Sequence, residues 1–170
     1  MRIDIITLFP DIFFGPLGES IVARAVKKGL IEINTVDLRD FSHDERGTVD
    51  DKPYGGGPGM LMKPEPLFEA VESLRNEDSL VLLTSPQGVR FDQSVAERLS
   101  TEKHLVIICG HYEGVDERVR EALVDMEISI GDYVLTSGNL PSMVITDAVT
   151  RLLPGALGSP LAAGWRTCPL

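Results

Sequence analysis

The strongest constraint on the fold comes from two short stretches that are apolar without interruption. Residues 80–84 read LVLLT and residues 104–109 read HLVIIC. A strand with one face in water alternates apolar and polar side chains, whereas a strand covered on both faces is continuously apolar. These two stretches therefore predict central strands of a parallel sheet with helices on both faces, an α/β fold.

Weaker strand and helix signals alternate along the rest of the chain. We expect further strands at residues 1–8, 31–38 and 128–135. We expect helices at residues 18–28, 64–75, 92–99, 115–123 and 140–153. Residues 39–63 hold many Gly, Pro and charged side chains, which predicts a long functional loop. The last helix is apolar on most sides and should be buried in the fold or against another chain.

Composition narrows the class of protein. The chain has 170 residues, with 16 basic and 26 acidic side chains and a formal net charge of −10. This charge disfavours the binding of nucleic acid through bulk electrostatics. Residues 1–63 alone hold eight basic and ten acidic side chains, so a locally basic surface in the first third of the chain stays open.

The cysteines and the hydropathy of the sequence predict where in the cell the protein is located. Cys109 and Cys168 lie far apart in the sequence, which favours reduced thiols over a disulfide scaffold. A membrane helix needs about 20 apolar residues, and no run of that length is present. The first residues, MRID, do not form a signal-peptide pattern. We therefore expect a cytoplasmic protein with no membrane partner.

Three glycine-bearing loops follow three of the predicted strands. They span residues 84–88, 110–114 and 131–138. Because the carboxyl ends of parallel strands meet at one edge of a sheet, these loops can offer backbone N–H and C=O groups to a single ligand. One such loop alone is better explained as a simple turn, but the three together favour a binding site.

Common site patterns are absent from the sequence. It contains no phosphate-binding P-loop, no dinucleotide fingerprint after the first strand and no zinc-ligand spacing. The chain also lacks the nucleophile elbow of serine hydrolases. Scattered potential metal ligands are usually solvated side chains, so we expect no metal site from His43, Asp44, His111, Glu113 and Asp116.

Several longer motifs carry a resemblance to a known family. They are LFPDIF (8–13), RDF (39–41), TVDD (48–51), PYGGGPGM (53–60), SPQG (85–88), CGHYEGVDER (109–118), SIGDYVL (129–135) and LPGALG (153–158). In this order they resemble the N-terminal domain of bacterial tRNA (guanine-N1-)-methyltransferases, of the SPOUT class. The resemblance implies a methyltransferase domain at residues 1–158 with a C-terminal trefoil knot. It also implies a cytoplasmic homodimer that shares its site between subunits and binds tRNA, not DNA.

The family resemblance implies a reaction and assigns residues to it. The methyl group passes from S-adenosyl-L-methionine to N1 of the guanine 3′ of the anticodon. The implied cofactor-binding residues are Thr84, Ser85, Pro86, Gly110, Tyr112, Glu113, Ile130, Gly131, Tyr133, Leu135, Gly138 and Pro141. The implied catalytic residues at the guanine site are Glu113 and Arg151. The implied tRNA-binding residues are Asp50, Tyr54, Gly55, Gly59, Arg24, Arg46 and Lys52, with Lys27 and Lys28 as further phosphate contacts. Each assignment has a simpler alternative. Glu113 can be an ordinary loop carboxylate, Arg151 a surface residue at the end of a helix, and the basic residues an ordinary solvated face.

Some positions depart from the family pattern. Ser137 stands where the family has glycine, and Asn139 where it has an acid. Residues 159–170 read SPLAAGWRTCPL, an atypical tail in place of the family's linker aspartate, the expected general base, and its tRNA-gripping C-terminal domain. We therefore expect a dimer that binds cofactor but transfers little or no methyl alone. The alternatives are a non-catalytic S-adenosylmethionine-binding dimeric module and a purely structural dimerisation domain.

Overall fold

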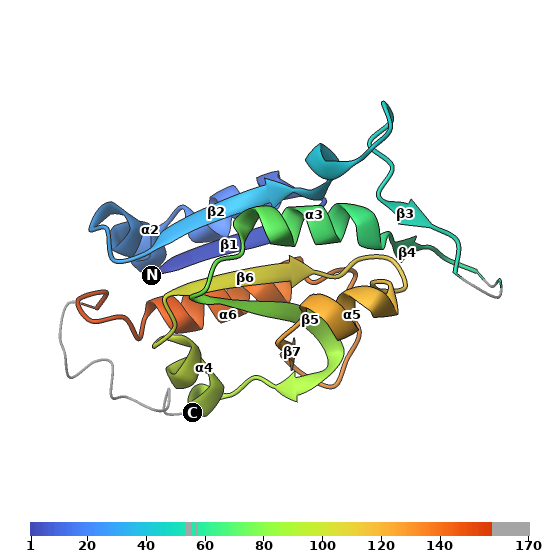
Figure 1. The fold of residues 1–170 in the computed structure, drawn as a ribbon. Helices are drawn as coiled ribbons and strands as arrows, with labels where there is room; N and C mark the ends of the chain where they lie inside the picture. Colours follow the sequence, from blue (N-terminus) through green and yellow to red (C-terminus); the bar gives the residue numbers. More distant parts are fainter. Residues whose placement is uncertain (54–55, 57, 158–170) are drawn as a thin grey trace.

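A parallel sheet of five strands forms the centre of the molecule (Figure 1). The computed structural model describes residues 1–53, 56 and 58–157. The strand order is β2-β1-β6-β5-β7, and every neighbouring pair is parallel. The strands are β1 (Arg2–Thr7), β2 (Glu32–Asp37), β5 (Ser79–Arg90), β6 (His104–Cys109) and β7 (Met126–Ser129). The two continuously apolar stretches are thus the adjacent inner strands β5 and β6, as predicted.

Helices cover both faces of this sheet. They are α1 (Phe14–Leu17), α2 (Ser20–Lys27), α3 (Pro64–Leu74), α4 (Gln93–Leu99), α5 (Glu117–Leu123) and α6 (Asn139–Thr150), with 3₁₀ turns η1 (Pro10–Phe13) and η2 (Leu38–Phe41). One apolar core lies between the sheet and the helices α1, α2, α4 and α6, and it contains Ile107 of β6. The other core lies beneath α3 and α5 and contains Ile108 of the same strand. Alternate residues of β6 therefore enter opposite cores, which explains why the strand carries no polar face.

The long segment between β2 and α3 holds a small antiparallel hairpin. Its strands are β3 (Asp50–Asp51) and β4 (Leu61–Met62). Met62 is fully buried in the core beneath α3 and α5, so the hairpin is anchored at its base. Most of residues 39–63 otherwise lack regular structure, as the sequence predicts.

Three sequence expectations about element boundaries were wrong. The strand expected at 128–135 ends at Ser129, because Ser129 Oγ lies 2.9 Å from Gly131 O and 3.3 Å from Gly131 N and closes a local turn. The loop expected at 84–88 lies inside β5 as a bulge. The helix expected at 140–153 ends at Thr150. It exposes Leu140 and Val144 within this chain, so its expected burial against another chain stays a prediction.

A buried polar cluster joins the amino ends of the inner strands. Asp4 on β1 is fully buried, and its Oδ2 lies 2.7 Å from Nε2 of the buried His104 on β6. His104 Nδ1 lies 2.7 Å from Ser79 Oγ on β5, and Asn34 Nδ2 donates to Asp4 Oδ1 over 3.0 Å. A neutral imidazole with its proton on Nε2 satisfies both neighbours at once. The cluster thus ties four strands together at the edge opposite the glycine-bearing loops.

Among the described residues, no helix is both long enough and apolar enough to cross a bilayer.

We predict that Asp4→Ala lowers the free energy of unfolding by about 3 kcal/mol, because it leaves the buried Nε2 of His104 without its acceptor and removes the partner of Arg2. Asp78→Ala is the matched control: Asp78 also makes an ion pair, with Lys103 at 2.8 Å, but both side chains are exposed. The control should cost less than about 0.5 kcal/mol. Urea unfolding followed by circular dichroism measures both. Equal losses would show that the buried cluster adds no stability of its own.

Candidate functional site

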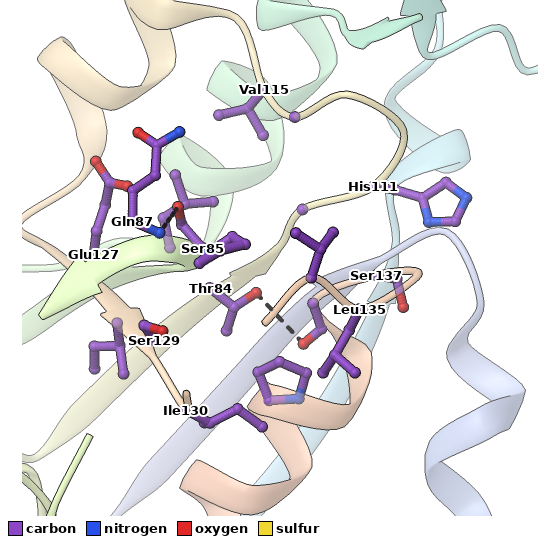
Figure 2. A pocket seen from close by; sticks show the side chains of 18 of the residues that line it. Thr84, Ser85, Gln87, His111, Val115, Glu127, Ser129, Ile130, Leu135 and Ser137 are labelled. Atoms are coloured by element: carbon purple, nitrogen blue, oxygen red, sulfur yellow. Dashed lines mark hydrogen bonds between the residues drawn. The ribbon is translucent and has the colours of Figure 1, made fainter. Parts of the chain in front are cut away.

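A cavity of about 440 Å³ opens at the carboxyl ends of β5, β6 and β7. Its walls are the bulge of β5 and the two glycine-bearing loops that follow β6 and β7 (Figure 2). It is lined by all the residues that the resemblance assigned to the cofactor: Thr84, Ser85, Pro86, Gly110, Tyr112, Glu113, Ile130, Gly131, Tyr133, Leu135, Gly138 and Pro141. The structure therefore brings these residues together, and their role in binding stays a prediction.

The three loops meet at a tight backbone junction. Gly138 N donates to Gly110 O over 2.7 Å, and Thr84 Oγ1 lies 3.1 Å from Ile108 O and 3.4 Å from Gly138 O. A Cβ at Gly138 would overlap Thr84 Oγ1 and lie 2.8 Å from Gly110 N. Glycine is therefore required at 138 by the close approach of two segments, and not by its φ of −75°.

A bulge in β5 shapes the second wall. Thr84 and Val89 both pair with Ile128 of β7, so residues 85–88 are an insertion opposite a single residue. A Cβ at Gly88 would lie 2.5 Å from Ile128 N, which explains the glycine at the return of the bulge. Ser85 Oγ accepts a hydrogen bond from Gln87 N over 3.2 Å and stabilises the loop. The bulge turns Ser85 and Pro86 into the cavity wall.

The cavity has an apolar part and a charged part. Figure 2 shows Ile130 and Leu135 in one region and Gln87 and Glu127 in another. In the charged region Arg120 Nε donates to Glu127 Oε1 over 2.7 Å, and Arg120 Nη1 donates to Glu117 Oε2 over 2.8 Å. These carboxylates, Glu127 first, raise the pKa of Arg120. The cavity thus suits a ligand with a flat apolar ring and polar groups that reach the loop backbone.

The loop after β6 carries one free carboxylate. Tyr112 adopts a left-handed conformation with φ of +58°, which is uncommon for a residue with a side chain. Glu113 follows it, and within the described part of the chain its carboxylate has no hydrogen-bond or ion-pair partner. Glu117 and Glu127, the other two carboxylates of the cavity wall, are both held by Arg120. Glu113 is therefore the lining acid, among described residues, that is free to bind a ligand.

His111 and Tyr112 belong to this loop, and their rings are in contact. Their rings are 4.5 Å apart, and the His111 ring lies 5.3 Å from the ring of Phe9. Burial and the nearby charge of Arg39 lower the pKa of His111. Burial and the charge of Asp50 raise the pKa of Tyr112. Asp50, a predicted tRNA contact, therefore lies within electrostatic reach of the cavity loop.

The described residues of the site hold neither an activated thiol nor a cluster of potential metal ligands. Burial raises the pKa of Cys109 to about 12, so its thiol stays protonated and is a poor nucleophile. No three His, Cys, Asp or Glu side chains within residues 1–53, 56 and 58–157 gather into a metal site. His43 instead lies 2.6 Å from Glu69, and Asp116 is held by Arg118.

The predicted RNA contacts fall into two groups. Asp50, Gly59, Arg46 and Lys52 lie in or next to the hairpin, whereas Tyr54 and Gly55 lie outside the described residues. Arg24, Lys27 and Lys28 lie on or just after α2, and Lys28 Nζ donates to Gly155 O beyond the end of α6. The structure thus separates the hairpin group from the α2 group.

Arg151 is not brought to Glu113 within this chain. It follows the last residue of α6 and does not line the cavity. The twelve residues of α6 rise about 18 Å from the loop junction at Gly138. Arg151 and the cavity that Glu113 lines therefore lie at opposite ends of α6.

The positions that depart from the family pattern have local roles. Ser137 Oγ accepts a hydrogen bond from Asn139 N over 3.3 Å at the start of α6. Asn139 is buried, and its Oδ1 accepts from Thr7 Oγ1 over 2.9 Å. These contacts join the start of α6 to the end of β1.

Sequence reasoning missed part of the cavity wall. Gln87, Val115, Glu117, Arg120 and Glu127 line it but were not predicted. The i,i+3 spacing of Glu117 and Arg120 on one helix was the signal that could have found two of them. Glu127 had no such signal, because β7 was placed too late in the sequence.

Comparisons with known proteins agree over nearly the whole chain. A family model described as "tRNA (Guanine-1)-methyltransferase TrmD" matches residues 1–164. A curated protein of Dictyoglomus turgidum named tRNA (guanine-N(1)-)-methyltransferase is 60% identical over 94% of this chain. One of the same name from Carboxydothermus hydrogenoformans is 55% identical over 96% of it. The chain spans 65% and 64% of the length of these two relatives.

A solved structure shares the fold. The tRNA (m1G37) methyltransferase from Aquifex aeolicus superposes with a TM-score of 0.85 at 45% sequence identity. The match covers 94% of this chain and 73% of that one.

We predict that Gly138→Ala disrupts the loop junction, because the new methyl group meets Thr84 Oγ1 and the Gly110 backbone. The variant should lose at least about 3 kcal/mol of stability or fail to fold. Gly15→Ala is the control, since no described atom lies within 4 Å of its Cβ position; it should cost clearly less, namely the strain of a helical alanine before Pro16. Thermal unfolding of both proteins measures the difference, and a Gly138→Ala protein as stable as the control would contradict the described junction.

Proposed function

This chain belongs to the tRNA (guanine-1)-methyltransferase family, and on that premise we propose that it binds a methyl donor and presents it to a guanine of tRNA. The observation that carries the proposal is the cavity at the carboxyl ends of β5, β6 and β7, walled by three backbone loops. The proposed substrate places the chain in the cytoplasm. The proposed target atom is N1 of the guanine 3′ of the anticodon.

The cavity residues fit S-adenosylmethionine as the donor. Ile130 and Leu135 offer an apolar slot for the adenine, and the loop backbone can bond the edge of the ring. At Gly110 the one described atom within 4 Å of the Cβ position, apart from the chain neighbours, is Thr84 O, so a ligand can approach the bare backbone there. When bound, the sulfonium supplies an already activated methyl group.

The protein then has to align the guanine and manage a proton. Methyl transfer needs no covalent enzyme intermediate, so positioning supplies much of the rate. Glu113 is exposed and unpartnered among the described residues, so its oxygens can accept hydrogen bonds from the N–H edge of a guanine. A guanidinium such as that of Arg151 can hold O6 or a phosphate with its planar fork. Together they would orient N1 toward the methyl group.

We propose that the working unit is a homodimer. Exposed apolar side chains on η1, α1 and α6 support this, because such patches mark association surfaces: Phe9, Ile12, Phe14, Leu140 and Val144. These elements contact one another, so the residues share one region of the surface. A two-fold axis there would let each chain carry its Arg151 toward the cavity of its neighbour.

We also propose the trefoil knot of the SPOUT class. The segment from Ile130 to Gly138 lines the cavity with the loops after β5 and β6, and Gly138 is bonded to the backbone of Gly110. The chain then continues into α6, which packs under β1 and β6 rather than beside β7. A segment held between two loops and leaving on the far side is consistent with a threaded path.

We predict that S-adenosylmethionine binds this chain, with heat in calorimetry and a rise in melting temperature. At a concentration of 100 times Kd the stabilisation should reach about 2.7 kcal/mol. If neither heat nor a rise in melting temperature is seen, the alternative of a purely structural dimerisation domain is favoured.

Transfer of a tritiated methyl group to unmodified tRNA, with Glu113→Ala and Arg151→Ala as controls, separates an enzyme from a binding module. Donor binding without any transfer would favour the module.

We predict that Leu140→Glu combined with Val144→Glu produces monomers, because two carboxylates would be buried in the proposed interface. Val26→Glu is the control: it changes another exposed valine, on α2. Sedimentation velocity distinguishes the two species. If the double variant stays dimeric, or the wild-type chain is a monomer, the interface proposed on α6 is wrong.

A further inference from the structure

The side chain of Glu113 is confined by a glycine instead of a polar partner. A Cβ at Gly59 would overlap Glu113 Cγ, and it would lie 2.6 Å from Oε1 and 2.8 Å from Cδ. The Glu113 side chain therefore lies directly across the bare Cα of Gly59. Among the described residues no hydrogen bond or ion pair holds this exposed carboxylate, and the contact with Gly59 restricts its side chain on one side.

The hairpin that carries Gly59 is fastened to the loop that carries Glu113. Glu113 N donates to Met60 O over 3.0 Å, and Met62 N donates to Gly114 O over 3.0 Å. A third hydrogen bond runs from Asp116 N to Met62 O over 3.2 Å. Since Met62 is also fully buried, the hairpin and the loop form one unit next to the cavity.

Two separate requirements select glycine at position 59. Its φ is +91°, in the region that side chains rarely adopt, and its Cβ position is occupied by Glu113. Gly29 meets only the first requirement, with φ of +69° and nothing within 4 Å of its Cβ position. Comparing the two glycines therefore separates backbone strain from contact with Glu113.

We propose that Gly59 is a positioning residue: its bare Cα lets the hairpin close over Glu113 and hold the free carboxylate toward the guanine site. This inference rests on the proposed function, because it assumes that Glu113 meets a guanine. Van der Waals confinement leaves every lone pair of the carboxylate available, which a hydrogen bond to the protein would not. RNA that binds the hairpin then affects the position of Glu113 directly, because three backbone hydrogen bonds join the hairpin to the segment that carries Glu113.

The test is a double-mutant cycle between positions 59 and 113. Glu113→Ala removes Cγ, Cδ and Oε1, so Gly59→Ala should then cost only its backbone strain, as Gly29→Ala does. In the wild-type background Gly59→Ala should cost more than Gly29→Ala. Urea unfolding measures this coupling, and it needs neither donor nor RNA. Equal costs of Gly59→Ala in the two backgrounds would overturn the contact on which the proposal stands.

A second readout tests positioning rather than mere contact. Binding of an anticodon stem-loop RNA is compared with binding of the same RNA carrying inosine, which lacks the 2-amino group, at the target position. Wild type should prefer guanine by about tenfold, the gain from one hydrogen bond to a charged group. Gly59→Ala and Glu113→Ala should each lose this preference, and Gly29→Ala should keep it.

The remaining outcomes are also decisive. The unfolding cycle can show coupling between positions 59 and 113 while Gly59→Ala still prefers guanine over inosine. Gly59 would then be only a packing neighbour of Glu113, and the proposal would be overturned. Wild-type protein that binds no RNA would overturn the proposed function, and with it the positioning role, while the unfolding cycle would still report the contact. Loss of preference in Gly29→Ala as well would show that backbone strain alone accounts for the effect.

Discussion

The candidate site depends on one close approach between backbone segments. Gly138 lies against Gly110 and Thr84 so tightly that no Cβ fits, and a 2.7 Å hydrogen bond joins the first two. The segment after β7 is thereby held against the bulge of β5 and the loop after β6, and the cavity is the space these three segments leave. At Gly110 and Gly138 the wall is bare backbone, so the proposed ligand could bond N–H and C=O groups whose positions are fixed by the sheet.

The charge of the molecule agrees with this kind of site. A net charge of −10 disfavours RNA binding by bulk attraction. The proposed RNA binding would then rest on a few groups in a fixed geometry, such as the hairpin beside Glu113. Arg120 pairs with both Glu117 and Glu127, which leaves Glu113 as the lining carboxylate without an ion-pair partner among the described residues. A single free carboxylate discriminates between base edges better than a diffuse acidic surface.

The sequence predicted the sheet and its helices because burial on both faces leaves a continuous apolar signal, as in LVLLT and HLVIIC. It placed the end of β7 wrongly, since the turn at Ser129 depends on a side-chain hydrogen bond to Gly131 that has no periodic signature. The family motifs supplied the cavity residues. They could not supply Glu127, whose place in the wall follows from an ion pair with Arg120. Pairing across elements is a property of the folded chain and leaves no mark in local patterns.

The position of Arg151 at the far end of α6 links the proposed guanine site to the proposed dimer. A helix is rigid, so α6 fixes the distance between the junction at Gly138 and its own far end. The same helix exposes Leu140 and Val144, which need a partner surface to leave water. If α6 pairs with its copy, the association that buries these residues also moves Arg151 toward the neighbouring chain. An isolated chain would then hold a complete donor cavity but an incomplete guanine site, because the cavity closes within one subunit and the base edge is met by two.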